Sequence, residues 1–244
     1  ITPQILELLE NGLHVVSTCE ELVYPWDTAP KLAASIDQAA RDSGLAVLST
    51  GVNPGFLMDF LPIAVSRIAR KVDSVLVERY QNAMPRREAF QRKIGAGLTV
   101  DEFWERVKVG NFGHAGLTAS VQLLAAGLGM DLDTAGETIE PVIAEQAMTT
   151  DFLSIKAGDV AGVYQVGVGN RDGKELIRLV FRAAVGEPES FDRISLTGTP
   201  DLVSVFPSGV PGDVATGAIT VNAIPPVMSL KPGLRTMVDL WPTA

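Results

Sequence analysis

The feature that most constrains the fold is a unit of helix, glycine and short apolar strand that occurs twice in the first 50 residues. In the first copy, an apolar helical stripe precedes Gly12, and a predicted strand covers residues 13–17. In the second, Pro30 opens a helix, Gly44 ends it, and a predicted strand covers residues 45–48. Glycine readily ends helices, and helices that alternate with buried strands are typical of a parallel sheet with right-handed crossovers. Because two strands alone are not stable, we expect upstream residues or another chain to complete the sheet.

The rest of the chain changes from a helical to a strand periodicity. A helix is predicted over 56–70, a strand over 72–82, and mostly helical structure over 86–128. Beyond about residue 138, apolar residues recur at every second position, and the turn 170–173 is a hairpin signal. The remaining predicted elements are antiparallel strands and one late helix, over 160–168, 176–185, 191–197, 202–206 and 213–224.

This order of elements predicts an α/β protein in which a parallel sheet is followed by an α+β domain with a mostly antiparallel sheet. We expect residues 1–55 to form part of the first domain and residues 56–210 to form the second. Residues 211–244 are expected to be a return helix and tail that pack against the first domain.

Composition excludes several classes of function. Lys and Arg number 20 against 29 Asp and Glu, and the net charge of -9 disfavours a nucleic-acid partner. No apolar run approaches the roughly 18–20 residues that span a bilayer, so no membrane partner is expected. One cysteine and two histidines exclude a disulfide framework, argue against a metal centre and fit a reducing cytoplasm. The sequence starts at Ile1, without an initiator Met and without a signal-peptide pattern, so we expect it to begin inside a longer gene product.

The loop after the first predicted strand carries two adjacent acids. Glu20 and Glu21 follow the strand directly, and Tyr24 comes shortly after them. In open parallel sheets, ligands bind beyond the carboxyl ends of the strands. A carboxylate there can carry a proton or pair with a substrate ammonium. Acids at the start of a helix are also stabilised by its dipole, so the spacing alone leaves both interpretations open.

The loop after the second predicted strand is rich in small and polar residues. Asn53 followed by Pro54 is explained as a helix N-cap without any ligand. Gly51 and Gly55 let a ligand approach the backbone closely, and the Asn53 amide can hydrogen-bond a carboxamide such as that of nicotinamide. No predicted strand is followed by the G-x-G-x-x-G loop of dinucleotide-binding proteins.

Three further residues are candidates for a role in a site, and the first two have two interpretations each. His114, set among glycines, can line a pocket or lie in a surface loop. Tyr80 can face a cleft or fill one face of a strand. Asn222, in an apolar helix, is expected to need a buried partner.

Taken together, these motifs resemble the 2,4-diaminopentanoate dehydrogenase and amine dehydrogenase family within the dihydrodipicolinate-reductase-like superfamily. The resemblance spans almost the whole chain. The motifs that carry it are, in chain order, STCEELVYPW at 17–26, TGVNPGFLMD at 50–59, GHAGL at 113–117, NAIP at 222–225, KPGL at 231–234 and DL at 239–240.

The resemblance implies a Rossmann domain that binds NAD or NADP, and a second domain that supplies a substrate wall and a homodimer contact. The implied reaction is reversible oxidative deamination of a primary amine or diamino acid, with a ketone on the other side. The catalytic carboxylate of the family falls on Glu20 or Glu21, and we prefer Glu20. The implied contacts are Thr18, Thr50, Gly51 and Asn53 for the cofactor, and Tyr24, Tyr80 and His114 for the substrate.

Two departures restrict this inference. Dihydrodipicolinate reductases carry a His-His pair, a Lys and a Ser-Gly-Thr turn where this sequence reads ERYQNAMP at 78–85, so a heterocyclic dicarboxylate substrate is not expected. The glycine-rich loop that holds the pyrophosphate is also absent from the sequence. Two alternatives therefore stay open: a dihydrodipicolinate-reductase-like imine or carbonyl reductase, and a non-catalytic dimerising module that lacks the nucleotide loop.

Overall fold

The computed structural model describes residues 1–110 and 112–240, which form two compact units. The first unit comprises Ile1–Ile68, Thr118–Asp131 and Pro211–Ala244, and the second comprises Ala69–Leu117 and Leu132–Val210. Residues 56–68 and 118–131, which the sequence assigned to the second domain, belong to the first compact unit. None of the helices in the described ranges is long and apolar enough to cross a lipid bilayer.

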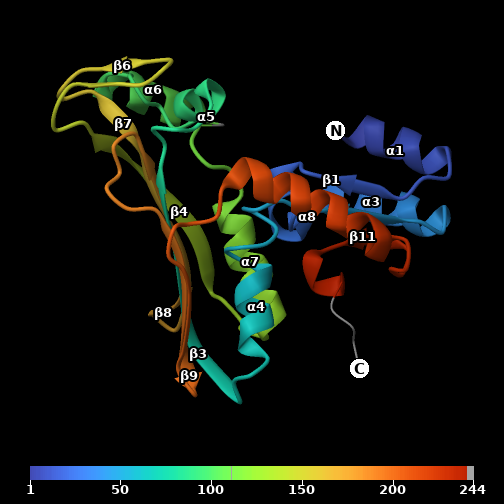
Figure 1. The fold of residues 1–244 in the computed structure, drawn as a ribbon. Coiled ribbons are helices and arrows are strands. Elements are labelled where there is room, and N and C mark those ends of the chain that lie inside the picture. Colours follow the sequence, from blue (N-terminus) through green and yellow to red (C-terminus); the bar gives the residue numbers. More distant parts are fainter. Residues whose placement is uncertain (111, 241–244) are drawn as a thin grey trace. The chain divides into compact units, whose positions relative to one another are not determined.

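The first unit is built on a parallel sheet of three strands (Figure 1). β1 (Val15–Ser17), β2 (Ala46–Ser49) and β11 (Gly233–Arg235) lie in the order β1-β2-β11, and both pairs are parallel. We expected the completing strands to come from outside the sequence, but the chain's own tail supplies one of them. The pairing of β11 with β2 joins residues almost 190 positions apart, for example Leu234 and Val47. No local pattern in the sequence signals such a pairing.

Helices cover both faces of this sheet. α1 (Thr2–Glu10) and α3 (Pro30–Asp42) pack on one face, in a core that includes Val47 of the central strand. α8 (Gly212–Val227) packs on the other face, against Leu48. A strand buried on both faces has apolar residues in succession, which explains why β2 reads as a continuous apolar run.

The helix predicted over 56–70 is shorter than expected. Only α4 (Phe60–Ser66) is helical, and its N-cap is Asp59 rather than Asn53. The preceding residues form turns that contain a cis Asn53–Pro54 peptide bond. Gly55 has a φ of 115°, which is incompatible with a helix at that position. The Asp59 side chain accepts the N–H of Phe60 at 2.6 Å, so the helix begins there.

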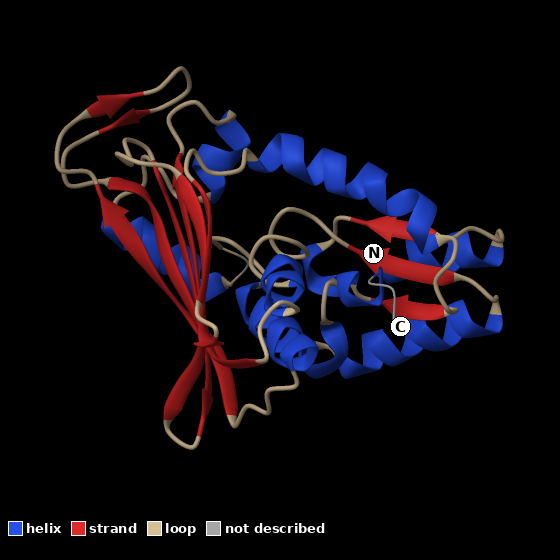
Figure 2. Ribbon diagram, turned by 60° about the horizontal axis from the view of Figure 1, so that its bottom comes forward, coloured by secondary structure: helices blue, strands red, loops and turns tan. Residues whose placement is uncertain are grey.

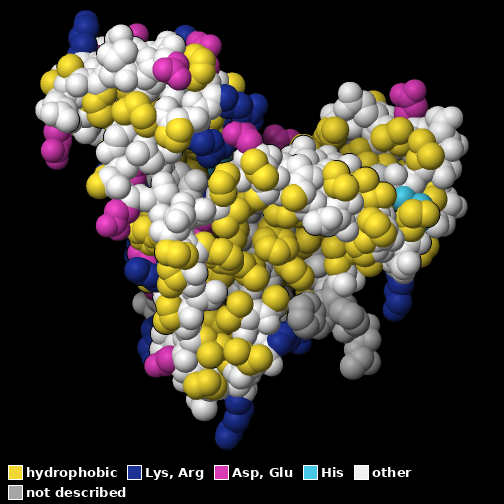
Figure 3. Space-filling model, viewed as in Figure 1, with side chains coloured by type: hydrophobic (Ala, Val, Ile, Leu, Met, Phe, Trp, Pro, Cys, Tyr) yellow, Lys and Arg dark blue, Asp and Glu magenta, His cyan; other side chains and the backbone are white. Residues whose placement is uncertain are grey.

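The outer side of α8 is apolar and exposed. Hydrophobic side chains are visible along this helix in Figure 3, and Val214, Val221 and Met228 have exposed fractions of 73%, 62% and 65%. Asn222 is exposed as well. The expectation that Asn222 needs a buried partner was therefore wrong, because its side of the helix faces away from the core.

The second unit is built on a large sheet, which stands out in red in Figure 2. Its six strands lie in the order β10-β9-β3-β8-β7-β4. The pair β3–β8 is parallel and the other neighbours are antiparallel, as the predicted fold class required. The strands are β3 (Lys71–Asn82), β4 (Thr134–Ile143), β7 (Val160–Arg171), β8 (Lys174–Ala184), β9 (Phe191–Thr199) and β10 (Leu202–Phe206), with a separate small pair of β5 (Met148–Thr149) and β6 (Ser154–Ile155).

The predicted helical stretch 86–128 divides into three helices: α5 (Glu88–Lys93), α6 (Val100–Val109) and α7 (Leu117–Leu128). α5 and α6 pack on one face of the six-stranded sheet, where Phe103 is completely buried.

The predicted hairpin joins β7 and β8. Asp172 and Gly173 have φ values of 51° and 72°, as a type I′ turn requires.

Candidate functional site

The carboxyl ends of β1 and β2 bring two loops of the first unit together. Ser17 lies opposite Ser49 in the parallel ladder, so the chain leaves both strands at the same edge of the sheet. The N–H of Thr50 donates to the Ser17 carbonyl at 2.8 Å. The Ser49 hydroxyl donates to the Cys19 carbonyl at 2.6 Å. Hydrogen bonds therefore join the loop after β1 to the loop after β2, at the edge where ligands bind in open parallel sheets.

The loop after β1 opens with a short 3₁₀ turn, η1 (Glu20–Leu22). Leu22 is completely buried in the core of the unit and anchors this turn to the sheet. Glu20 is half-buried, whereas Glu21 is exposed. The two adjacent acids thus differ in environment, although both lie in the first turn, where a helix dipole also favours acids.

Thr18 and Tyr24 flank this turn. Thr18 is exposed and Tyr24, directly before α2 (Pro25–Thr28), is half-buried. The Tyr24 ring centroid lies 5.1 Å from that of Trp26. Burial raises the pKa of the Tyr24 hydroxyl, and the negative charge of Asp27 raises it further. The hydroxyl is therefore protonated at neutral pH and can donate a hydrogen bond.

The loop after β2 contains buried polar atoms without partners. Thr50 and Asn53 have exposed fractions of 1% and 7%. Within the described ranges, neither the Thr50 hydroxyl nor either polar atom of the Asn53 amide has a hydrogen-bond partner. Leaving a buried polar group unpaired costs about 1–3 kcal/mol, and such groups in a native protein often mark a site for a ligand or water. Asn53 does not act as the predicted N-cap, so capping does not explain it.

A buried aspartate holds the shape of this loop. Asp59 accepts hydrogen bonds from the N–H of Gly55 at 2.8 Å and from the Ser120 hydroxyl at 2.7 Å. A Cβ added to Gly55 would lie 2.7 Å from the Gly51 nitrogen, so only glycine allows this close approach. Burial raises the pKa of Asp59, although its hydrogen bonds oppose the shift. Asp59 was not predicted from the sequence, because Asn53-Pro54 has the same N-cap pattern earlier in the chain.

His114 lies in the second unit, in a loop clamped by Gln165. The Gln165 side chain accepts the His114 N–H at 2.6 Å and donates to the His114 carbonyl at 3.1 Å. The His114 ring stacks on Phe181, with centroids 4.6 Å apart. The residue as a whole is half-buried, but its Nε2 atom is buried and has no partner in the described ranges. Burial above all, with the charges of Lys93 and Arg79, lowers the pKa of His114 to about 3.

Tyr80 lies on the opposite face of the same sheet. Tyr80 pairs with Arg182 across β3 and β8, whereas Phe181, which contacts His114, pairs with Arg79. Because neighbouring residues of a strand point to opposite faces, Tyr80 and His114 do not share a face. Tyr80 instead stacks on Phe191 at 4.7 Å, and burial raises the pKa of its hydroxyl. The structure therefore does not bring these two predicted substrate contacts together.

Two buried charges of the second unit, Arg79 and Asp192, form a structural pair. Arg79 contacts Asp192 at 2.7 Å, and their side chains are only 3% and 4% exposed. Arg79 also donates to the Val210 carbonyl, and Asp192 accepts the Val210 N–H. The pair therefore anchors Val210, the last residue of the second unit, to the sheet. In the part of the chain that the structure describes, no group of three or more His, Cys, Asp or Glu side chains is arranged to hold a metal ion.

Comparison with known proteins identifies the family to which this chain belongs. Residues 56–244 match the family model described as the 2,4-diaminopentanoate dehydrogenase C-terminal domain. The chain is also 34% identical over 240 residues to the 2,4-diaminopentanoate dehydrogenase of Acetoanaerobium sticklandii, an alignment that covers 96% of this chain and 68% of that protein. The chain belongs to the 2,4-diaminopentanoate dehydrogenase family.

A solved structure shares the fold of this 2,4-diaminopentanoate dehydrogenase family member. The amine dehydrogenase from Mycobacterium smegmatis superposes with a TM-score of 0.84 at 24% sequence identity, covering 99% of this chain and 72% of that one. This likeness confirms the predicted fold class, a parallel sheet joined to a mostly antiparallel one. The family match begins directly after the Asn53–Gly55 turn and includes Asp59, Tyr80 and His114.

Proposed function

We propose that this family member is an NAD(P)-dependent dehydrogenase that deaminates a primary amine or diamino acid oxidatively and runs in reverse from the ketone. The observation that carries the proposal is the set of buried, unpartnered polar atoms of Thr50 and Asn53 at the carboxyl edge of the parallel sheet. Glu20 lies in the loop that is hydrogen-bonded to theirs. The relative from Acetoanaerobium sticklandii, a 2,4-diaminopentanoate dehydrogenase by name, supports the same class of reaction.

The unpartnered atoms fit the carboxamide of a nicotinamide. The Asn53 amide offers one acceptor and two donor hydrogens, and the Thr50 hydroxyl offers both functions, so together they match a carboxamide oxygen and nitrogen. A nicotinamide cofactor supplies the hydride acceptor or donor of such a reaction. We propose Thr50, Gly51 and Asn53 as its contacts, together with the exposed Thr18 at the end of β1. These residues suit NAD and NADP equally.

Glu20 is proposed to hold the substrate amine and to take its proton. A carboxylate attracts the ammonium form of the substrate, and removal of a proton frees the nitrogen lone pair that becomes part of the imine. Once that proton has passed to solvent, the same carboxylate assists the attack of water on the imine carbon by accepting a proton from the water. Glu20 suits this role better than Glu21, because Glu20 is half-buried and Glu21 is exposed.

Tyr24 and His114 are proposed as substrate contacts. Tyr24 presents a protonated hydroxyl beside the Glu20 turn, and the neutral His114 ring has a buried nitrogen available for a hydrogen bond. Tyr80 was expected to join them, but it lies on the other face of the six-stranded sheet from His114. Only one of Tyr80 and His114 can therefore line a given pocket of this unit, and we favour His114.

The proposal includes a homodimer that acts in the cytoplasm. Val203 and Val205 on the edge strand β10 are 67% and 45% exposed, and an exposed apolar edge of this kind suits contact with a second copy. The single cysteine suits a reducing compartment. Light scattering after size-exclusion chromatography measures the assembly, and a monomer at micromolar concentration would contradict this part of the proposal.

The function is tested by amine-dependent reduction of NAD⁺ and NADP⁺ with the full-length protein. The amines are 2,4-diaminopentanoate, ornithine and simple primary amines, and the reverse reaction uses ammonium with the matching ketones. We expect one amine class to reduce one cofactor and the matching ketone to reverse the reaction. Reduction of imines or carbonyls without any amine oxidation would favour a dihydrodipicolinate-reductase-like enzyme. Activity in neither direction would favour a non-catalytic module.

A further inference from the structure

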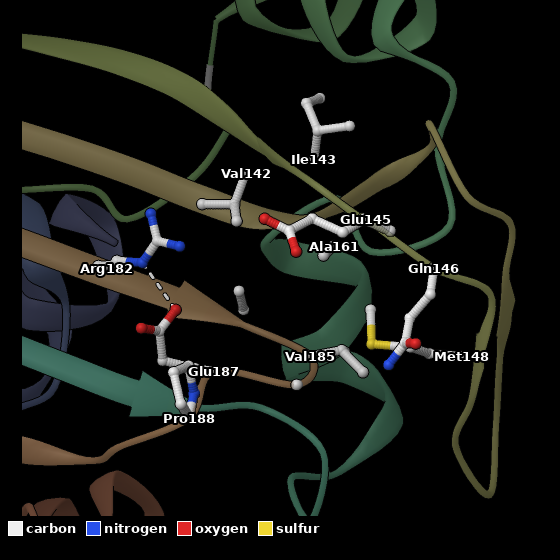
Figure 4. A pocket seen from close by; sticks show the side chains of 13 residues that line it. Val142, Ile143, Glu145, Gln146, Met148, Ala161, Arg182, Val185, Glu187 and Pro188 are labelled. Atoms are coloured by element: carbon white, nitrogen blue, oxygen red, sulfur yellow. Dashed lines mark hydrogen bonds and ion pairs between the residues drawn. The ribbon is translucent and has the colours of Figure 1, made fainter.

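A cavity of about 570 Å³ lies within the second unit (Figure 4). It opens around the last residues of β4 and β8 and the loop that follows β8. None of its lining residues belongs to the candidate site described above. Its volume is in the range of small-molecule sites. Its charged side chains are Glu145, Arg182 and Glu187, and its larger apolar side chains are Val142, Ile143, Met148 and Val185.

An ion pair between Arg182 and Glu187 lines this cavity. The Arg182 Nε atom donates to a Glu187 carboxylate oxygen at 2.7 Å, and the side chains are 31% and 7% exposed. The buried carboxylate holds the guanidinium in place through Nε alone. Within the described ranges, the terminal nitrogens of Arg182 have no hydrogen-bond partner. Those nitrogens are the pair that binds a carboxylate in two-point geometry.

A second carboxylate lies across the cavity. Figure 4 shows the carboxylate of Glu145 turned toward the same space as the Arg182 guanidinium. The cavity thus holds one positive and two negative side chains. A ligand that is only an anion meets two carboxylates, and a ligand that is only a cation leaves the terminal nitrogens of Arg182 unpaired. A zwitterion satisfies both ends.

We propose that this cavity binds a small aliphatic α-amino acid. The carboxylate of the ligand pairs with the terminal nitrogens of Arg182, and its ammonium pairs with Glu145. Its aliphatic side chain packs against Val142 and Val185. The site is separate from the proposed dehydrogenase site and does not depend on it.

The test is calorimetric binding of three matched ligands to the full-length protein without cofactor. They are 2-aminopentanoate, pentanoate, which lacks the ammonium, and 1-aminobutane, which lacks the carboxylate. Because hydrogen bonds to a charged group are stronger than those between neutral groups, we expect 2-aminopentanoate to bind at least about tenfold more tightly than either of the other two.

Variants assign the binding to the cavity. Arg182→Gln and Glu145→Gln should each weaken 2-aminopentanoate binding about tenfold or more. The double variant Arg182→Gln/Glu187→Gln should do the same without leaving a buried carboxylate unpaired. Arg178→Gln is the matched control. Arg178 lies on the same strand in an exposed pair with Glu175, and its loss should leave the affinity unchanged.

Three outcomes would overturn the proposal. The first is no detectable binding of 2-aminopentanoate, and the second is equal binding of the three ligands. The third is binding that Glu20→Gln abolishes and the folded double variant retains, because that binding would belong to the dehydrogenase site. Failure here leaves the amine-dependent reduction of NAD(P)⁺ untouched, so the two proposals are tested independently.

Discussion

The carboxylate of Asp59 accepts a hydrogen bond from the hydroxyl of Ser120 at 2.7 Å, and neither residue has any exposed surface. The two residues are 61 positions apart in the chain. The same carboxylate also accepts a hydrogen bond from the N–H of Gly55. It therefore links α7 to the turn that contains Asn53. The unpartnered atoms of the candidate site are therefore positioned by a buried network and not by local sequence alone.

Removal of the Ser120 hydroxyl should destabilise the protein. Ser120→Ala leaves one acceptor position of a buried carboxylate unsatisfied, which costs about 1–3 kcal/mol in the free energy of unfolding. Urea denaturation measures this. Ser43→Ala is the control, because the Ser43 hydroxyl is exposed and bonds only the Ala39 carbonyl of its own helix; its effect should stay within about 0.5 kcal/mol. Equal effects of the two substitutions would contradict the role of the Asp59 network.

Stability should depend on pH through His114. Its pKa is about 3 in the folded protein, below the ordinary value of 6.5, so between these values the unfolded chain binds a proton that the folded protein does not. The contribution of His114 is fully present above pH 6.5 and is lost as the pH falls toward 3, at roughly 1.4 kcal/mol per pH unit. His114→Phe keeps a ring against Phe181 but cannot titrate, so its unfolding free energy should fall less steeply with acid. Identical slopes for the two proteins would show that His114 titrates normally.

The buried Arg79–Asp192 pair should be sensitive to loss of one partner. Asp192→Asn leaves the guanidinium of Arg79 buried without a counter-charge, which costs about 3–5 kcal/mol. Asp73→Asn breaks the exposed pair with Lys71, whose side chains are 48% and 68% exposed, and should cost at most about 1 kcal/mol. Thermal or urea unfolding measures the loss of unfolding free energy in each of the two variants. A cost below about 1 kcal/mol for Asp192→Asn would mean that water reaches the pair.

Thr50→Val should separate stability from cofactor binding. The substitution replaces an unpartnered buried hydroxyl by a methyl group of similar size, so the free energy of unfolding without cofactor should hold steady or rise by about 1 kcal/mol. Loss of one hydrogen bond should weaken NAD(P) binding by roughly 2- to 12-fold. Thr197→Val, at an exposed position on β9, should change neither. Unchanged cofactor affinity in folded Thr50→Val would remove Thr50 from the proposed contacts.

Features encoded within a few residues could be predicted from the sequence. Gly12 and Gly44 end their helices with φ values of 76° and 69°, and Asp172-Gly173 forms the expected hairpin turn. Each of these depends on the conformational preference of one or two residues. The parallel character of one sheet and the mostly antiparallel character of the other were also predicted, from the local order of helices and strands.

Features that depend on distant pairing could not be predicted. The strand β11 exists because it pairs with β2, and the Asp59 carboxylate that caps α4 accepts a hydrogen bond from Ser120, 61 positions away. Whether Tyr80 and His114 share a face depends on the register between β3 and β8, which local sequence patterns do not predict. The placement of Glu20 and Asn53 in neighbouring loops followed from the parallel order of β1 and β2.

Glu20 is proposed to take the proton of the substrate amine. Measurement of kcat/KM for amine-dependent NAD(P)⁺ reduction in Glu20→Gln and Glu21→Gln tests this role, because the two variants remove the same charge from adjacent positions of one turn. We expect a loss of about 10²-fold or more in Glu20→Gln, with nearly wild-type kinetics in Glu21→Gln and an unchanged free energy of unfolding in both. Wild-type kinetics in folded Glu20→Gln would contradict it.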